Sequence, residues 1–101
     1  MQHQSLNFRH EPGLRYHFRG FGNNVTVTLY SIDKAGYNLE ATFIIEGVDG
    51  LNELTLRNGD RRPIARKLTL EVSGCNISCF YTGYNLNGPY NCDIDRRDAN
   101  V

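Results

Sequence analysis

The clearest structural signal in the chain is the stretch VTVTLYSI at residues 25–32. Val25, Val27 and Leu29 occupy one set of alternate positions, and threonine or tyrosine follows each of them. Because successive side chains of a β-strand point to opposite faces, this pattern predicts a strand with one buried side and one side in water. The β-branched residues in the stretch also favour a strand.

The same alternation of apolar and polar residues continues in both directions from this stretch. Alternating segments occur at residues 5–10, 14–19, 39–46, 54–56, 64–72, 77–82 and 90–94. Clusters of glycine, asparagine and proline separate them, and Asn58-Gly59 is typical of a type I′ turn between two paired strands. The spacing predicts one all-β domain over residues 1–101, an antiparallel β-sandwich or small barrel of seven to eight short strands.

The length and the net charge of the chain limit the classes of function that it can have. The chain has 101 residues, enough for one domain, and its 11 basic and 11 acidic residues cancel. A neutral chain lacks the overall positive charge that draws a protein to nucleic acid or to an anionic membrane. No apolar run approaches the roughly 20 residues that span a bilayer, and the first residues show no signal-peptide pattern. We therefore expect no membrane span, and we leave the compartment open between a secreted, a bacterial or phage, and a cytosolic protein.

The three cysteines, Cys75, Cys79 and Cys92, are too few for a disulfide-based scaffold. If Cys75 and Cys79 share one strand, they lie about 13 Å apart, which is too far for a bridge. Cys79 and Cys92 flank a loop and form the better candidate pair, while three reduced thiols are the alternative. Zinc lacks a fourth ligand, since all three histidines lie within the first seventeen residues. The sequence thus predicts no metal and no cofactor.

The segment between the last two expected strands has the composition of a contact loop. Tyrosine offers a large contact area with few rotatable bonds, and asparagine and glycine adapt their hydrogen bonds to a partner. The same residues suit a sugar, with an aromatic face on its ring and amides on its hydroxyl groups. Tyr81 and Tyr90 have a structural alternative, because they could pack as a cross-strand pair. The predicted contact residues are Tyr81, Tyr84, Asn85, Asn87, Tyr90 and Asn91.

Arginine gathers around the Asn58-Gly59 turn, where residues 56–70 hold four arginines and one lysine against a single aspartate. The planar guanidinium group forms paired hydrogen bonds with carboxylate or phosphate. We predict that these side chains contact a protein partner with an acidic patch. The alternative is a charged hairpin tip that keeps a sheet edge soluble. The arginines concerned are Arg57, Arg61, Arg62 and Arg66.

Histidine and arginine near the start of the chain give a third hypothesis. Arg15, His17 and Arg19 share one face of the expected strand, where they could grip phosphates. His10 or His17 with Glu40 could then supply acid and base for RNA cleavage. The alternative is the solvated face of an amphipathic strand, with its charges set against neighbouring carboxylates. No familiar spacing links the histidines to a carboxylate, so we predict no catalytic residues.

These features favour a non-enzymatic recognition module that binds another protein through the tyrosine- and asparagine-rich loop and the arginine-rich hairpin. A carbohydrate-binding, lectin-like domain that uses the same loop is the alternative. An RNA-binding or RNase-like protein that uses His10, His17 and the arginine row is a further hypothesis, although we do not expect a nucleic-acid partner. All three hypotheses require the strands to display these side chains outward.

Overall fold

The computed structural model describes residues 2–36, 38–50, 52–83 and 90–96. Within these ranges the chain forms β-strands and no α-helix, and hence no helix long and apolar enough to cross a membrane. The strands are β1 (Gln2–Asn7), β2 (Leu14–Gly20), β3 (Asn23–Ala35), β4 (Asn38–Glu46), β5 (Glu53–Arg57), β6 (Arg61–Ala65), β7 (Leu68–Ser73), β8 (Asn76–Gly83) and β9 (Asn91–Arg96).

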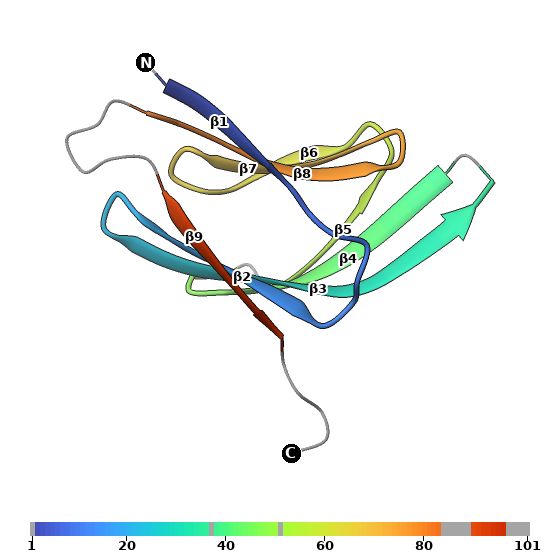
Figure 1. Ribbon diagram of the computed structural model, residues 1–101, viewed down its shortest axis with the longest axis horizontal. Coiled ribbons are helices and arrows are strands. Elements are labelled where there is room, and N and C mark those ends of the chain that lie inside the picture. Colours follow the sequence, from blue (N-terminus) through green and yellow to red (C-terminus); the bar gives the residue numbers. More distant parts are fainter. Residues whose placement is uncertain (1, 37, 51, 84–89, 97–101) are drawn as a thin grey trace.

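The strands form two antiparallel sheets that pack face to face (Figure 1). The four-stranded sheet has the order β1-β8-β7-β6, and the five-stranded sheet has the order β5-β4-β3-β2-β9. The edge strands β1 and β9 both lie toward the viewer in Figure 1. The all-β prediction is confirmed, and of the two architectures expected the molecule adopts the sandwich.

The alternation seen in the sequence places the core between the two sheets. In β2, Leu14, Tyr16 and Phe18 are buried, whereas Arg15 and His17 between them are partly exposed. Each apolar side chain removed from water in this way contributes roughly 1.5–3 kcal/mol to stability. The largest fully buried side chains are Tyr16, Phe18, Phe43, Leu29, Leu39, Ile45, Leu68, Leu70, Ile77, Val25, Val27 and Val72.

The Asn58-Gly59 turn joins the two sheets, so the prediction of a hairpin there is wrong. β5 pairs with β4 in the five-stranded sheet, whereas β6 pairs with β7 in the four-stranded sheet. A type I′ turn needs positive φ at both central residues, but of the two only Gly59 has one, at 96°. Asn58 Oδ1 instead accepts a hydrogen bond from the Gly74 amide at 2.7 Å. This contact ties the turn to the connection between β7 and β8.

The alternating segment at residues 64–72 is two strands, so the described part of the chain contains nine strands. The chain reverses at Arg66 and Lys67, and Lys67 has a φ of 58°. The polar Arg66 in an otherwise apolar row is thereby explained, because it lies in a turn. Pro63 lies in the edge strand β6, as expected for a residue that cannot donate a hydrogen bond to a neighbouring strand.

Tyr30 lies at a β-bulge in the middle of β3. The pairing of β3 with β4 changes register between Leu29, which faces Phe43, and Ser31, which faces Thr42. Tyr30 has no opposite residue in this ladder, and it is 63% exposed. Bulges re-aim side chains and recur next to functional sites. The bulge therefore presents an aromatic ring on the solvent side of the five-stranded sheet.

Candidate functional site

The solvent side of the five-stranded sheet, which we call the outer face, brings together polar residues from segments distant in the sequence. Arg15, His17 and Arg19 lie on this side of β2, as the alternation predicts. The register places Thr26 of β3 opposite His17 on one flank and β9 on the other. Three strands thus supply the polar groups at this end of the outer face.

A hydrogen-bonded cluster centres on His17. Its Nε2 lies 3.1 Å from Asp95 Oδ2, and its Nδ1 lies 2.9 Å from Thr26 Oγ1. Because a carboxylate only accepts, the proton belongs on Nε2 of the neutral ring, and Nδ1 then accepts from the Thr26 hydroxyl. Arg15 donates to both oxygens of Asp95, at 2.8 and 3.0 Å. Arg15, with His17, holds the pKa of the Asp95 carboxyl below its ordinary value.

The order of hydroxyl, imidazole and carboxylate in this cluster is the one that serine hydrolases use. Here, however, the paired bonds from Arg15 already compensate the charge of Asp95. The contacts join three strands, and a further ion pair of 2.7 Å between Arg96 and Glu11 also holds β9 in place. The cluster therefore fastens the edge strand β9 to the sheet.

The residues of the RNA-cleavage hypothesis are not brought together. Glu40 pairs with Arg57 on β5, at the other end of the sheet from His17. His10 lies in the exposed connection between β1 and β2. The sequence reasoning missed Asp95 and Thr26 as partners of His17. Only the β2–β9 register could have indicated Asp95, because it lies far from His17 in sequence.

A hollow on the outer face adjoins Tyr30 and has a volume of about 710 Å³. Tyr30 and Ile44 supply apolar surface, and Thr28 and Asn52 supply polar groups. Volumes of this size are typical of ligand-binding clefts. Its full lining consists of Pro12, Gly13, Thr28, Leu29, Tyr30, Ile44, Ile45, Glu46 and Asn52, and we call it the Tyr30 groove.

Acidic side chains border the Tyr30 groove. Glu46 lines it, and Glu53 lies beside it as the cross-strand partner of Ile44; both are exposed. Neither carboxylate takes part in an ion pair with another residue that the structure describes. Arg15, which faces Thr28 in the register, directs its guanidinium group to Asp95 instead. The groove therefore combines apolar surface with uncompensated negative charge.

The predicted arginine-rich contact surface is divided between the two sheets. Arg57 pairs with Glu40 at 2.8 Å, and Arg61 pairs with Glu71 at 3.3 Å and stacks on the Phe80 ring. Arg66 lies at the opposite end of β6, where its guanidinium group covers the Phe21 ring. Arg62 is exposed on β6. Two of the four arginines thus already hold carboxylates of the same chain, which weakens the argument for an acidic partner.

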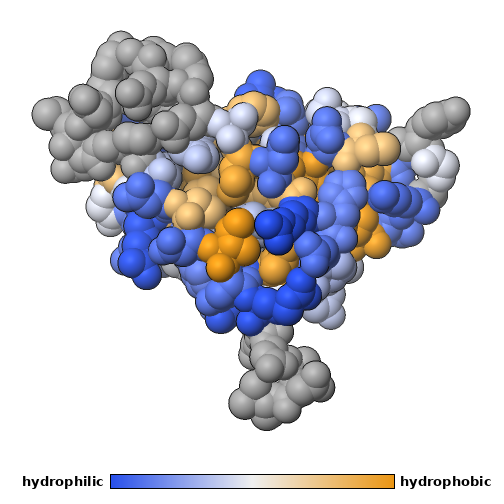
Figure 2. Space-filling model, in the orientation of Figure 1, coloured by the Kyte–Doolittle hydropathy of each residue, from blue (hydrophilic) through white to orange (hydrophobic). Residues whose placement is uncertain are grey.

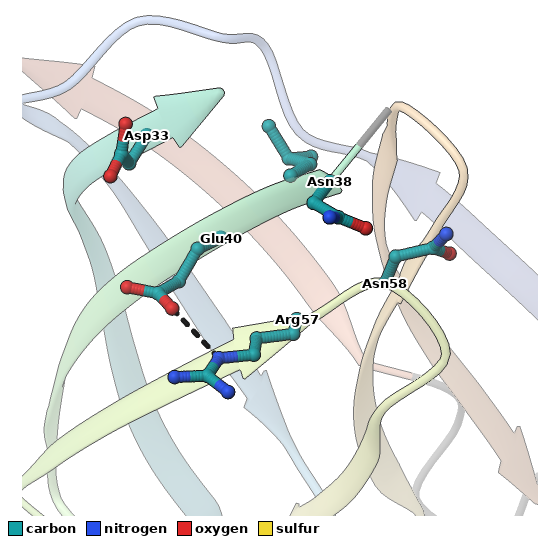
Figure 3. Close-up of a pocket in the computed structure, with 6 residues that line it drawn as sticks. Asp33, Asn38, Glu40, Arg57 and Asn58 are labelled. Carbon is teal, nitrogen blue, oxygen red and sulfur yellow. Dashed lines mark hydrogen bonds and ion pairs between the residues drawn. The ribbon is translucent and has the colours of Figure 1, made fainter. Parts of the chain in front are cut away.

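A second hollow, of about 430 Å³, lies where β5 passes into the turn that joins the sheets (Figure 3). The Glu40 carboxylate and the Arg57 guanidinium group meet across it, and Asp33 lies opposite Glu40 in the β3–β4 register. Asn38 and Asn58 add two amide groups to its wall. The hollow therefore offers both hydrogen-bond donors and acceptors from planar polar groups.

The tyrosine- and asparagine-rich loop is described only at its ends. Tyr84, Asn85 and Asn87 lie outside the described residues. Tyr81 and Tyr90 are buried, with their rings 6.2 Å apart in an edge contact. They belong to the core, and because they come from different sheets they are not the cross-strand pair considered from the sequence. Asn91 is exposed at the start of β9.

Tyr90 is held at its polar end as well as by packing. Its hydroxyl donates to the carbonyl of Arg66 and accepts from Asn23 Nδ2. Its ring makes edge contacts with Phe18 and Phe21. Burial of a tyrosine is tolerated when its hydroxyl finds such partners. Tyr90 therefore anchors one end of the loop and does not offer its ring to a ligand.

Searches against protein-family models, curated proteins and solved structures each gave no match.

Proposed function

We propose that the protein is a non-enzymatic recognition module that binds another protein through the Tyr30 groove on the outer face. The observation that carries the proposal is the exposed Tyr30 ring, which lies at a β-bulge beside a hollow of about 710 Å³ on this face. Buried aromatic anchors supply much of the binding energy in protein interfaces, with tyrosine among the most frequent. Tyr30 lies on β3, which is paired with β2 and β4 inside the sheet, so little backbone entropy is lost when a partner binds.

The chemistry of the groove indicates the chemistry of the partner. Tyr30 and Ile44 offer apolar contact, while Glu46 and Glu53 leave negative charge beside them. An arginine or lysine is attracted both to these carboxylates and to the face of the tyrosine ring. We therefore propose a partner segment that carries a basic residue next to an apolar one.

Selection from a random peptide display library tests this proposal with a defined probe. We expect enrichment of peptides in which arginine or lysine adjoins an apolar residue. Tyr30→Ser should weaken binding of a selected peptide at least about tenfold, as expected for a central aromatic contact. Tyr30→Phe, which keeps the ring, should bind almost as well as the wild type.

Two further variants separate the groove from other surfaces. Glu46→Gln should weaken binding most at low salt, because it removes an exposed charge that salt would otherwise screen. Arg62→Gln, on the other sheet, should leave binding unchanged. Equal enrichment of the same peptides by the wild type and by Tyr30→Ser would refute the groove as the binding site.

Carbohydrate binding is a second candidate, and the hollow of Figure 3 favours it. Carboxylate, amide and guanidinium groups line that hollow from the three neighbouring strands β3, β4 and β5 and from the turn after β5. Such groups match the paired hydroxyl groups of a sugar ring with both donors and acceptors. On a glycan array we expect retained sugars to be lost with Arg57→Ala and kept with Arg62→Ala. An array that retains no sugar would exclude this candidate.

A further inference from the structure

Two cysteines face the same interior region from opposite sheets. Cys79 lies on β8 and is fully buried in the core. Cys92 lies on β9, is the register partner of the buried Phe18, and packs against the core from its edge. Cys75 is separate from them, exposed in the turn before β8. The structure holds all three as free thiols.

The neighbouring tyrosines indicate that the two thiols face each other. Tyr81 and Tyr90 meet across the core with ring centres 6.2 Å apart. Cys79 lies two residues before Tyr81, and Cys92 lies two residues after Tyr90. Side chains repeat on one face of a strand every second residue. Each cysteine is therefore the next residue on the same face as its tyrosine, on the side away from the loop. Immunoglobulin domains also carry a disulfide that links the two sheets of a sandwich.

The electrostatics of the region agree with this placement. Burial raises the pKa of Tyr81, and the nearby Cys92 and Cys79 thiols raise it further. Burial also raises the pKa of Cys79, again with a contribution from Cys92. Both influences agree with the placement of the two cysteines beside the tyrosine pair.

Cys92 can be reached by a small reagent. It is only partly buried, and it lies on the edge strand β9 beside Ile94, which is 44% exposed. Apolar surface gathers between the two sheets on this side of the molecule, bordered by hydrophilic residues (Figure 2). An oxidant can therefore approach Cys92 without unfolding of the sandwich.

We infer that Cys79 and Cys92 are a bridging pair, which a small-molecule disulfide oxidises to a covalent link between β8 and β9. The Cys92 thiolate attacks the oxidant, forms a mixed disulfide and releases one thiol. Cys79 then loses its proton and attacks the Cys92 sulfur, and the second thiol leaves. Two protein thiols are thus oxidised to one disulfide, and one oxidant molecule is reduced to two thiols.

Cys92 takes the first step because it is the more accessible of the two. Burial, with the adjacent Asp93 carboxylate, raises the pKa of Cys92 to about 11. The fully buried Cys79 is a still weaker nucleophile at neutral pH. The groups that surround Cys92 are Tyr16 of β2, Tyr81 and Cys79 of β8, and Asp93 of its own strand.

Oxidation of the folded protein with glutathione disulfide, followed by mass spectrometry of proteolytic fragments, tests the inference. We expect a fragment pair that joins Cys79 to Cys92 and has lost two hydrogen atoms. Cys75→Ser should form the same pair, whereas Cys92→Ser should not. The bridge closes a short loop, so the oxidised Cys75→Ser protein should melt roughly 10 °C above its reduced form.

A further variant distinguishes loss of the bridge from a failure of the protein to fold. Cys79→Ala keeps the buried site apolar and should fold, yet it should yield only glutathione adducts. A bridged fragment that forms in denaturant but never in the folded protein would overturn the inference. Exclusive modification of Cys75 in the folded wild type would do the same. The test is independent of the Tyr30 groove, since neither cysteine lies on the outer face.

Discussion

Gly47→Ala is expected to destabilise the sandwich by about 3–4 kcal/mol. Gly47 follows β4 with a φ of 94°, a backbone conformation that strains any L-residue with a side chain. A Cβ atom at this position would also lie 2.1 Å from the carbonyl oxygen of Asn24, so that β3 or the connection after β4 must shift. Urea denaturation should show a lower midpoint with an unchanged slope.

Gly50→Ala is the matched control for this prediction. Gly50 lies in the same connection with a φ of 76°, but a Cβ atom there would meet no atom within 4 Å. It should therefore show only the cost of the strained backbone, about 1–2 kcal/mol. If the two variants lose the same stability, the close approach of Gly47 to β3 does not exist in the folded protein.

Phe18→Ala is expected to lower the free energy of unfolding by about 3–5 kcal/mol. Phe18 is fully buried in β2, and its ring makes edge contacts with Tyr81 at 6.2 Å and Tyr90 at 6.3 Å. Its removal leaves a cavity between the sheets at the point where both ends of the predicted contact loop are anchored. The same denaturation measurement reports the loss.

Ile94→Ala provides the comparison for Phe18→Ala. Ile94 lies on β9 opposite Tyr16, but its side chain is 44% exposed at the edge of the sandwich. Much of its apolar surface is already in water, so we expect a loss below about 1 kcal/mol. A loss for Phe18→Ala as small as this would contradict the inter-sheet core.

The alternation of side chains was sufficient to predict the fold class. It identified the inward rows of β2, β3 and β4 correctly, because burial of one face imposes a period of two on the sequence. These predictions succeeded because each depends on neighbouring residues within one strand.

Pairing between distant segments could not be predicted in the same way. Asn58-Gly59 is a local hairpin signal, yet the strands on either side of it join different sheets. The contact of His17 with Asp95 depends on the β2–β9 register, and the bulge at Tyr30 depends on how β3 pairs with β4. Each is decided by tertiary pairing, which one strand's own sequence does not specify.

The tyrosines of the loop illustrate the same limit at the candidate site. The composition of the loop suits both contact with a partner and packing in the core. The structure buries Tyr81 and Tyr90. Tyr30, by contrast, belongs to a regular alternating stretch and gave no signal of its own as a binding residue. Tyr30 is distinguished by the hollow beside its ring, which segments distant in the sequence line together.

Amide chemical-shift mapping with a selected basic peptide tests the binding face most directly. The expected shifts fall on residues 28–31, 44–46 and 52–53, which form and border the Tyr30 groove. They should disappear when the same peptide is added to Tyr30→Ser. Shifts confined to residues 57–66, or to the strand ends beside residues 84–89, would instead place recognition on the arginine-rich turn or on the tyrosine loop and contradict the proposal.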